Sequence, residues 1–143
     1  MTDRSRAPRM NTGTRVPAER RGRRFPRPPG VELLSVADDG EWLRMRQSLW
    51  PDRPADAHRQ EMGGLRADPW RGTVFIYRGS GGVLCGFVEV RVRPDPGTPG
   101  RRRAQVQGWY VDPKYRGHGI GSALLGAATM WARAHGCPET LPA

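Results

Sequence analysis

A glycine-rich run, RGHGIG, extends from Arg116 to Gly121 and contains the residues whose types and spacing could do chemistry. Glycines let a backbone approach a ligand closely, and successive N–H groups at the start of a helix can converge on one anionic point. Such a point suits a pyrophosphate. We expect a Cβ at Gly119 or Gly121 to disturb the loop and the His118 side chain to matter little. The alternative is a glycine-rich turn that binds no ligand.

The spacing of the glycines excludes two other phosphate-binding loops. Counted from Gly117, the dinucleotide fingerprint G-x-G-x-x-G would need its third glycine at Ser122. A Walker A loop would need Gly-Lys followed by Ser or Thr, and the sequence has no such run.

A strand must lead into this run and a helix must follow it. Residues 106 to 111 are rich in β-forming side chains, and Asp112-Pro113 ends the strand because proline lacks an N–H donor and has a fixed φ. Apolar residues at helical spacing predict a helix from Ile120 to His135, with Gly136 as its C-cap.

Five further elements precede this strand. Trp42, Met45 and Leu49 form an apolar stripe with Arg46 beside it, which predicts one helix, and Gly63-Gly64 should break a weaker one. The predicted elements are a strand at 31–37, helices at 41–50 and 55–67, and strands at 73–77 and 83–93 joined by a glycine turn at 79–82. The last of these strands alternates valines with polar residues, so one face should be apolar and the other polar. The order is βααβββα, an α/β fold.

The N-terminal residues differ in composition from the rest. Residues 1–30 contain nine arginines, five prolines and two acids, with too few large apolar side chains to offset the entropy of ordering them. We expect a disordered tail that carries +7 of the formal charge of +10, followed by one domain at 31–143. The tail could be an arm for nucleic acid. We favour an extension without a selected partner, because 23 of the 24 basic residues of the chain are arginine, which indicates coding bias.

Composition excludes several other classes of protein. No apolar segment follows the first arginines as in a secretory signal, and no run approaches the ~18 apolar residues of a membrane span, so we expect a soluble cytoplasmic protein. Cys85 and Cys137 lack C-x-x-C spacing and should be buried in a reducing compartment. His58 and His118 have no metal-binding spacing with any partner, so no metal is expected.

The glycine-rich run and the strand before it match V-x-P-x-x-R-x-x-G-x-G through Val111, Pro113, Arg116, Gly119 and Gly121. In this motif the chain resembles the GNAT superfamily of acetyl-CoA-dependent N-acetyltransferases. The resemblance implies a mixed central sheet and acetyl-CoA as co-substrate, with its pantetheine arm and pyrophosphate held by this strand, loop and helix. The residues that inherit this role are Tyr110, Val111, Arg116, Gly117, His118, Gly119, Ile120 and Gly121.

Within the superfamily the chain is most similar to the aminoglycoside 6'-N-acetyltransferases. The similarity implies transfer of an acetyl group to the 6'-amino group of an aminoglycoside antibiotic, with Trp50 and Asp52 in the substrate pocket. Without the family context, Trp50 would be a large core or hinge residue. The motifs that carry the similarity are Trp42-Leu43-Arg44, Leu49-Trp50-Pro51-Asp52, Gly86-Phe87-Val88-Glu89 and Gly108-Trp109-Tyr110-Val111.

The chemistry of acetyl transfer adds requirements. An amine must lose a proton to attack a thioester, and N–H donors must stabilise the oxyanion that forms. We expect the backbone N–H groups of Tyr110 and Val111 to be these donors. Gln107 stands where the family has a glutamate. Its amide can hydrogen-bond an ammonium group but cannot accept the proton, and Glu89 is one of the acids that remain near the pocket. Gln107 and Glu89 are therefore the predicted catalytic side chains.

The family pattern continues after the last predicted helix with a strand, a helix and a hairpin, whereas six residues follow Cys137. Pro138 and Pro142 disfavour a full strand there. We therefore expect a fold that is incomplete at its C-terminus, with an unpaired edge on the strand at 106–111 that invites pairing into a homodimer. The alternative function is a catalytically weak or silent remnant that at most binds CoA.

Overall fold

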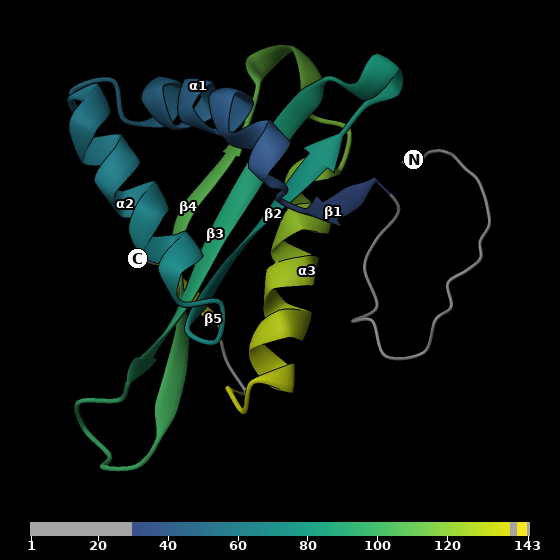
Figure 1. Cartoon of the computed structure of the whole chain (residues 1–143). Helices are drawn as coiled ribbons and strands as arrows, with labels where there is room; N and C mark the ends of the chain where they lie inside the picture. Colours follow the sequence, from purple (N-terminus) through teal and green to yellow (C-terminus); the bar gives the residue numbers. More distant parts are fainter. Residues whose placement is uncertain (1–29, 138–139, 143) are drawn as a thin grey trace.

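The computed structural model describes residues 30–137 and 140–142, so the predicted tail, apart from Gly30, lies outside the described residues. One sheet with the strand order β1-β2-β3-β4-β5 forms the centre. β1 to β4 are antiparallel neighbours (Figure 1), and β5 runs parallel to β4. The strands are β1 (Val31–Leu33), β2 (Gly72–Arg78), β3 (Leu84–Pro94), β4 (Arg102–Val111) and β5 (Thr140–Pro142).

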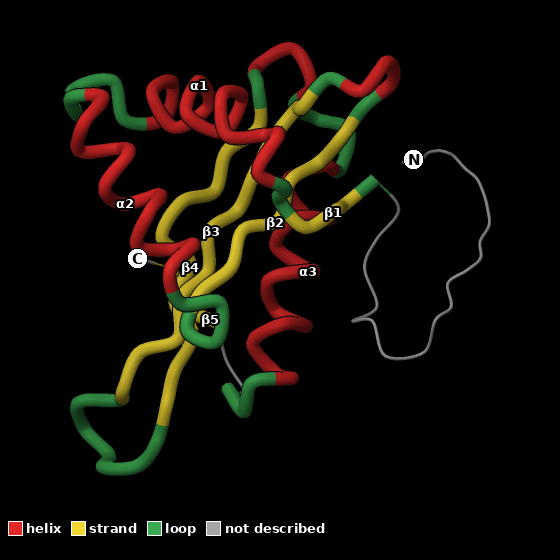
Figure 2. The backbone as a smooth tube through the Cα atoms, in the orientation of Figure 1, coloured by secondary structure: helices red, strands yellow, loops and turns green. Residues whose placement is uncertain are grey.

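Helices cover both faces of this sheet. α1 (Asp39–Leu49) and α2 (Ala55–Ala67) pack on one face, and α3 (Ile120–Ala134) packs on the other (Figures 1 and 2). The order βααβββα is confirmed, with the short β5 added after it. Figure 2 also shows the loop between β3 and β4 reaching well beyond the helices.

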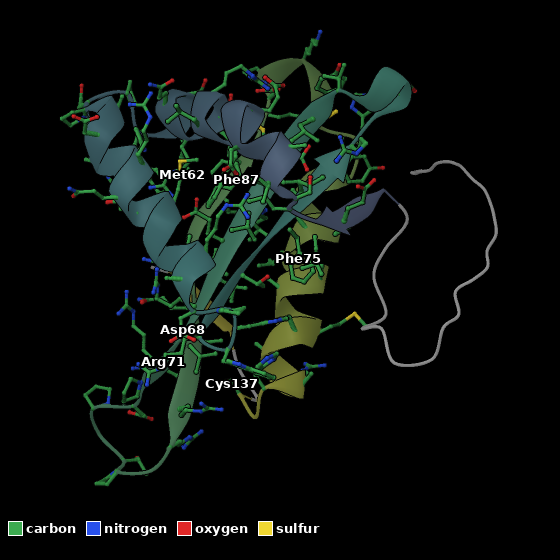
Figure 3. All side chains as sticks on the ribbon, viewed as in Figure 1. Met62, Asp68, Arg71, Phe75, Phe87 and Cys137 are labelled. Atoms are coloured by element: carbon green, nitrogen blue, oxygen red, sulfur yellow. The ribbon has the colours of Figure 1, made fainter. Side chains whose placement is uncertain are left out.

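β3 separates two apolar cores because its side chains alternate between the faces. Val88 points to the core beside α3, which Phe75 joins, whereas Phe87 packs with Met62 beneath α1 and α2 (Figure 3). The expected polar face is therefore not a solvated one. Two helices cover it, and Glu89 retains 1% exposure.

α2 continues through Gly63-Gly64, where the sequence predicted a break. The flanking residues Met62 and Leu65 are buried in the core under α1 and α2. Their packing outweighs the roughly 1 kcal/mol by which each glycine disfavours a helix.

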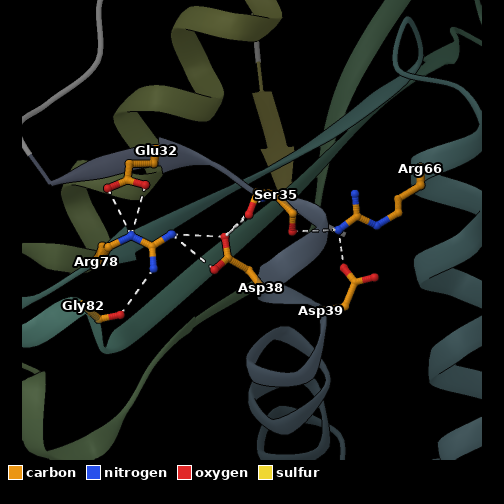
Figure 4. Close-up of polar contacts among 7 residues, drawn as sticks. All are labelled: Glu32, Ser35, Asp38, Asp39, Arg66, Arg78 and Gly82. Carbon is orange, nitrogen blue, oxygen red and sulfur yellow. Dashed lines mark hydrogen bonds and ion pairs between the residues drawn. The ribbon is translucent and has the colours of Figure 1, made fainter.

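The first strand is shorter than predicted and ends at Leu33. A 3-10 turn at Val36–Asp38 follows, in which the Asp38 carboxylate accepts hydrogen bonds from the N–H and the hydroxyl of Ser35, at 3.2 and 3.0 Å. Arg78 of β2 donates to both oxygens of Asp38 at 3.2 and 3.1 Å (Figure 4). These bonds fix the entry of the chain into α1.

The end of the chain corrects the predicted unpaired edge at 106–111 only at its first residue, Val106. Thr140–Pro142 forms β5 and pairs with residues 104 to 106 of β4. A proline is tolerated at position 142 because it is the last residue of this strand, where a missing N–H costs at most one ladder bond. Residues 107 to 111 of β4 have no strand partner on that side among the described residues, so dimerisation through this edge stays a prediction.

Two further sequence predictions concern membranes and cysteines. Within the described part of the chain, none of the helices is long and apolar enough to cross a membrane. Cys85 and Cys137 are free and buried, as predicted, and burial raises the pKa of both thiols.

Candidate active site

A cleft of about 430 Å³ opens where the end of β4 meets the N-terminus of α3. It brings together all the predicted cofactor residues except His118. The His118 ring is exposed and turns back on the loop, with Nδ1 3.1 Å from the carbonyl oxygen of Arg116. The lining residues are Leu49, Trp109, Tyr110, Val111, Tyr115, Arg116, Gly117, Gly119, Ile120, Gly121 and Ser122.

Two glycines of the loop are required by the backbone. Gly117 and Gly119 have φ angles of +83° and +82°, the left-handed region that residues with a Cβ disfavour. Gly119 is also the N-cap residue of α3. Gly121 lies inside the helix without a positive φ, and an added Cβ would meet the Trp109 ring at an ordinary 3.6 Å. The positive φ supports the predicted sensitivity to a Cβ at Gly119. At Gly121 a Cβ would not perturb the backbone dihedrals, and obstruction of a ligand there stays a prediction.

The edge of β4 offers a backbone donor to the cleft at Val111. The N–H of the next residue, Asp112, donates to the carbonyl oxygen of Cys85 at 2.8 Å, at the end of the β3–β4 ladder. Successive residues of an antiparallel strand face opposite sides, so the N–H of Val111 points away from β3 and that of Tyr110 points toward it. Of the two expected donors, the geometry leaves Val111 for a ligand in the cleft.

Arg116 is anchored at the rim of this cleft. Its Nε donates to the carbonyl oxygen of Val111 at 2.7 Å, and its guanidinium lies over the Tyr110 ring, 5.6 Å from the centroid. The bond to Val111 uses the Nε–H, and the terminal nitrogens carry further donors that suit an anionic ligand.

An arginine that the sequence analysis treated only as part of a motif ties α1 to the same loop. Arg44 donates to both carboxylate oxygens of Asp112, at 3.1 and 2.9 Å. These hydrogen bonds to Asp112, and those to Glu41, raise the pKa of Arg44. Asp112 directly precedes the turn into the glycine loop, so this pair couples the position of α1 to that of the loop.

Trp50 follows α1 directly, next to Leu49 of the cleft. Its ring packs on Gly108 of β4, where an added Cβ would lie 2.8 Å from the indole. Only a glycine permits this approach. The ring also stacks with His58 at a centroid distance of 6.2 Å, and the Arg53 guanidinium lies 4.2 Å from its centroid. Trp50 is thus a fixed wall beside the strand that carries the predicted catalytic glutamine.

A β-bulge directs Gln107 to the same face. The register of β3 and β4 shifts after Glu89, which faces Gly108, and leaves Gln107 as the extra residue of β4. Its Oε1 accepts a hydrogen bond of 2.7 Å from Nε of Arg91, which stands two residues after Glu89 and therefore on the same face of β3. Gln107 and Gly108 consequently both face α1 and α2, next to the Trp50 wall.

The buried centre of this face is Arg46 of α1, which is 1% exposed. Its terminal nitrogens contact Glu89 of β3 and Glu61 of α2, and its Nε donates to Nδ1 of His58 at 3.2 Å. Trp42 adds a bond of 2.9 Å from its indole N–H to Glu89. One side chain therefore joins α1, α2 and β3 through three partners.

The sequence contained a signal for this role. Arg46 is four residues from both Trp42 and Trp50, so in the helix predicted at 41–50 all three lie on one face. A charged residue on an apolar face needs a buried partner, and the pattern alone did not reveal which residue that partner is.

The bond from Arg46 assigns the roles of the two ring nitrogens of His58. Arginine can only donate, so Nδ1 of His58 accepts and Nε2 carries the proton. Nε2 lies 3.3 Å from the carbonyl oxygen of Trp50, to which it donates. Arg46 thus fixes the end of α1, and with it the indole of Trp50, through one intervening ring.

Both predicted catalytic side chains are already engaged. Gln107 is bonded to Arg91, and Glu89 is paired with Arg46. Burial raises the pKa of the Glu89 carboxyl, and the charge of Arg46 acts in the opposite direction. The side chain of Glu89 is 2% exposed, so a proton can reach it from the cleft only through a relay such as water.

The other acids near Trp50 do not gather at one point. Asp52 is exposed in the turn between α1 and α2, and Glu61 accepts a bond of 2.8 Å from Arg53. In residues 30–137 and 140–142, no three His, Cys, Asp or Glu side chains come together in a way that could hold a metal ion.

Comparison with known proteins identifies relatives of this chain. Residues 41–143 match the family model described as Acetyltransferase (GNAT) family. An aminoglycoside N(6')-acetyltransferase type 1 of Stenotrophomonas maltophilia is 39% identical over 113 residues, which make up 78% of this chain and 72% of that protein.

Solved structures of similar fold are consistent with that match. The 6'-N-acetyltransferase AAC(6')-IG from Acinetobacter haemolyticus superposes with a TM-score of 0.70 and 26% identity, covering 79% of this chain and 77% of that one. AAC(6')-Iy in complex with the bisubstrate analog CoA-S-monomethyl-acetylneamine also gives a TM-score of 0.70, with 27% identity and the same coverage of 79% and 77%.

Proposed function

Since this chain belongs to the acetyltransferase (GNAT) family, we propose that it transfers the acetyl group of acetyl-CoA to the 6'-amino group of an aminoglycoside. The observation that carries the proposal is the cleft in which the open edge of β4 meets the glycine loop and the N-terminus of α3. The bisubstrate analog bound to the AAC(6')-Iy relative joins CoA to acetylneamine, which supports both substrates. We place the reaction in the cytoplasm, where acetyl-CoA is formed.

The residues of the cleft fit a pyrophosphate and a thioester. Gly117 and Gly119 bring backbone close to the start of α3, where N–H groups and the helix dipole favour an anion, and Arg116 adds a positive charge. The N–H of Val111 is the donor for the thioester oxygen. It bonds more strongly to that oxygen once the tetrahedral intermediate carries a negative charge.

The acceptor amine would approach from the side of Trp50. Its nitrogen adds to the acetyl carbon to form the tetrahedral intermediate, and the C–S bond then breaks, so that CoA leaves as a thiolate and takes up a proton from water. The nitrogen loses its own proton, which must leave the site. We assign Trp50 to hold the sugar ring and Gln107 to orient the acceptor. We assign Glu89 to take the proton through a water, since burial raises its pKa and no direct path from the cleft is open. Asp52, exposed beside Trp50, is the remaining carboxylate for a substrate ammonium.

The test is release of the CoA thiol by the full chain with acetyl-CoA and either neomycin or paromomycin. These antibiotics form a matched pair, because paromomycin carries a hydroxyl where neomycin has its 6'-amino group. We expect thiol release with neomycin and little with paromomycin.

Equal rates with both antibiotics would move the reaction to a different amine. No release with neomycin, in a protein that still binds acetyl-CoA by calorimetry, would leave a CoA-binding protein without the proposed activity.

A further inference from the structure

Arg91 of β3 lies on the sheet face that α1 and α2 cover. We call the part of this face around Trp50 and Gln107 the acceptor face. The Nε of Arg91 donates to Oε1 of Gln107 at 2.7 Å, and the side chain is partly buried. A Cβ built at Gly72 would lie 3.8 Å from Cγ of Arg91, and one at Gly64 would lie 3.9 Å from its Nη2. The Arg91 side chain therefore passes Gly72 of β2 and reaches Gly64 of α2 at ordinary contact distance.

The charge of Arg91 is not cancelled by an ion pair. Glu89 and Asp68 act on it only through longer-range electrostatics, and within the described residues no carboxylate lies at salt-bridge distance from it. Burial and the neighbouring Arg93 lower the pKa of Arg91. The ordinary pKa of arginine lies far above neutral pH, so the Arg91 side chain stays charged there.

The other charges of this face are balanced. Glu89 is paired with Arg46, and Glu61 is paired with both Arg46 and Arg53. With Asp52 and Arg91, the charged side chains around Trp50 and Gln107 are three carboxylates and three arginines. The acceptor face therefore has no excess of negative charge to attract a polycation.

Arg91 also decides what Gln107 can offer. The guanidinium occupies one of the two acceptor positions of the amide oxygen, and the NH2 group remains as a donor toward a ligand. A donor beside a fixed positive charge suits a hydroxyl or ether oxygen next to the reacting amine. It disfavours a second ammonium group at the same place.

We infer that Arg91 is a specificity-determining residue, which makes the acceptor site prefer oxygen-rich amines of low positive charge over the most highly charged aminoglycosides. This inference rests on the proposed function and specifies the substrate class of the same site. Repulsion between the Arg91 guanidinium and one additional ammonium group in the site should lower the affinity by roughly threefold to tenfold.

The test compares kanamycin A with the more highly charged neomycin, both of which have a 6'-amine. We would measure kcat/KM with acetyl-CoA, and Kd by calorimetry, for the wild type, Arg91→Gln and Arg93→Gln. Arg93 is the matched control, because it makes the same kind of bond to Gln105, at 3.2 Å, one step farther along the strands. Arg91→Gln should raise the neomycin to kanamycin ratio by roughly threefold to tenfold, and Arg93→Gln should leave it unchanged. The effect of Arg91→Gln should shrink in high salt.

An unchanged ratio in Arg91→Gln, or an equal change in Arg93→Gln, would overturn the inference while the proposed acetyl transfer still stands. If the wild type transfers acetyl to neither antibiotic, the proposed function fails, and the Kd ratio alone decides about Arg91. Binding of neither antibiotic by the wild type and the variants would overturn both. If Arg91→Gln does not fold, Gln107→Glu serves as the second variant, because it adds a negative charge next to Arg91. It should also raise the neomycin to kanamycin ratio. An unchanged ratio in Gln107→Glu would contradict the inference.

Discussion

Replacing Arg46 by methionine should be the most destabilising single change on the acceptor face. The substitution leaves Glu89, whose side chain is 2% exposed, without its charged partner. Removing one member of a buried ion pair costs about 3 to 5 kcal/mol, which is a large part of the 5 to 15 kcal/mol of a typical domain. The lost contact with Glu61, which is 45% exposed, adds little because solvent screens it.

The assay is urea denaturation followed by tryptophan fluorescence and far-UV circular dichroism. With a slope of about 1 to 3 kcal/mol per molar urea, the midpoint should fall by roughly 2 M. Arg53→Met is the matched control, because Arg53 also bonds Glu61 but is 41% exposed. It should cost less than about 1 kcal/mol.

A double substitution isolates the stranded charge as the cause. Glu89→Gln removes the charge and keeps an acceptor for the indole N–H of Trp42, so Arg46→Met with Glu89→Gln should recover about half of the loss or more. If Arg46→Met costs no more than Arg53→Met, or if Glu89→Gln gives no recovery, the buried pair does not stabilise this face as reasoned.

Two further outcomes follow from the backbone and from the pH. Gly119→Ala should cost about 1 to 2 kcal/mol of stability and weaken acetyl-CoA binding, because the φ of Gly119 is +82°. Gly121→Ala should be neutral or stabilise the protein by up to about 1 kcal/mol. Equal effects of the two substitutions in urea denaturation and in calorimetry would contradict this. Burial alone would raise the pKa of Asp38, but hydrogen bonds from Ser35 and Arg78 outweigh it and hold the pKa below the ordinary 3.8. The stabilisation is therefore present above that pH and is lost as the pH falls through the lower folded value, so the wild type should lose stability relative to Asp38→Asn below about pH 4. The measurement is the urea midpoint between about pH 2 and 6. The control Asp56→Asn, at an exposed position, should follow the wild type over this range. If Asp38→Asn also follows the wild type in parallel, the role assigned to the Asp38 carboxylate is wrong.

The sequence was sufficient for features that depend on neighbouring residues. The strand, loop and helix around Gly119 are contiguous, so their β-formers, proline and glycines act locally, and the cleft contains the residues expected there apart from His118. The same reasoning predicted the order of the elements, because hydrophobic periodicity reports one element at a time. It was wrong at Gly63-Gly64, where packing of the flanking side chains overrides local propensity.

Only the tertiary structure decided the acceptor face. The partners of Arg46 come from α1, α2 and β3, and the contact between Trp50 and Gly108 joins a helix end to a distant strand. Likewise, the bulge that turns Gln107 to Arg91 depends on the register between β3 and β4. Local propensity carries no information about which strand residue lies opposite which, so the sequence could supply the charged residues of this face but not the pairing that neutralises them.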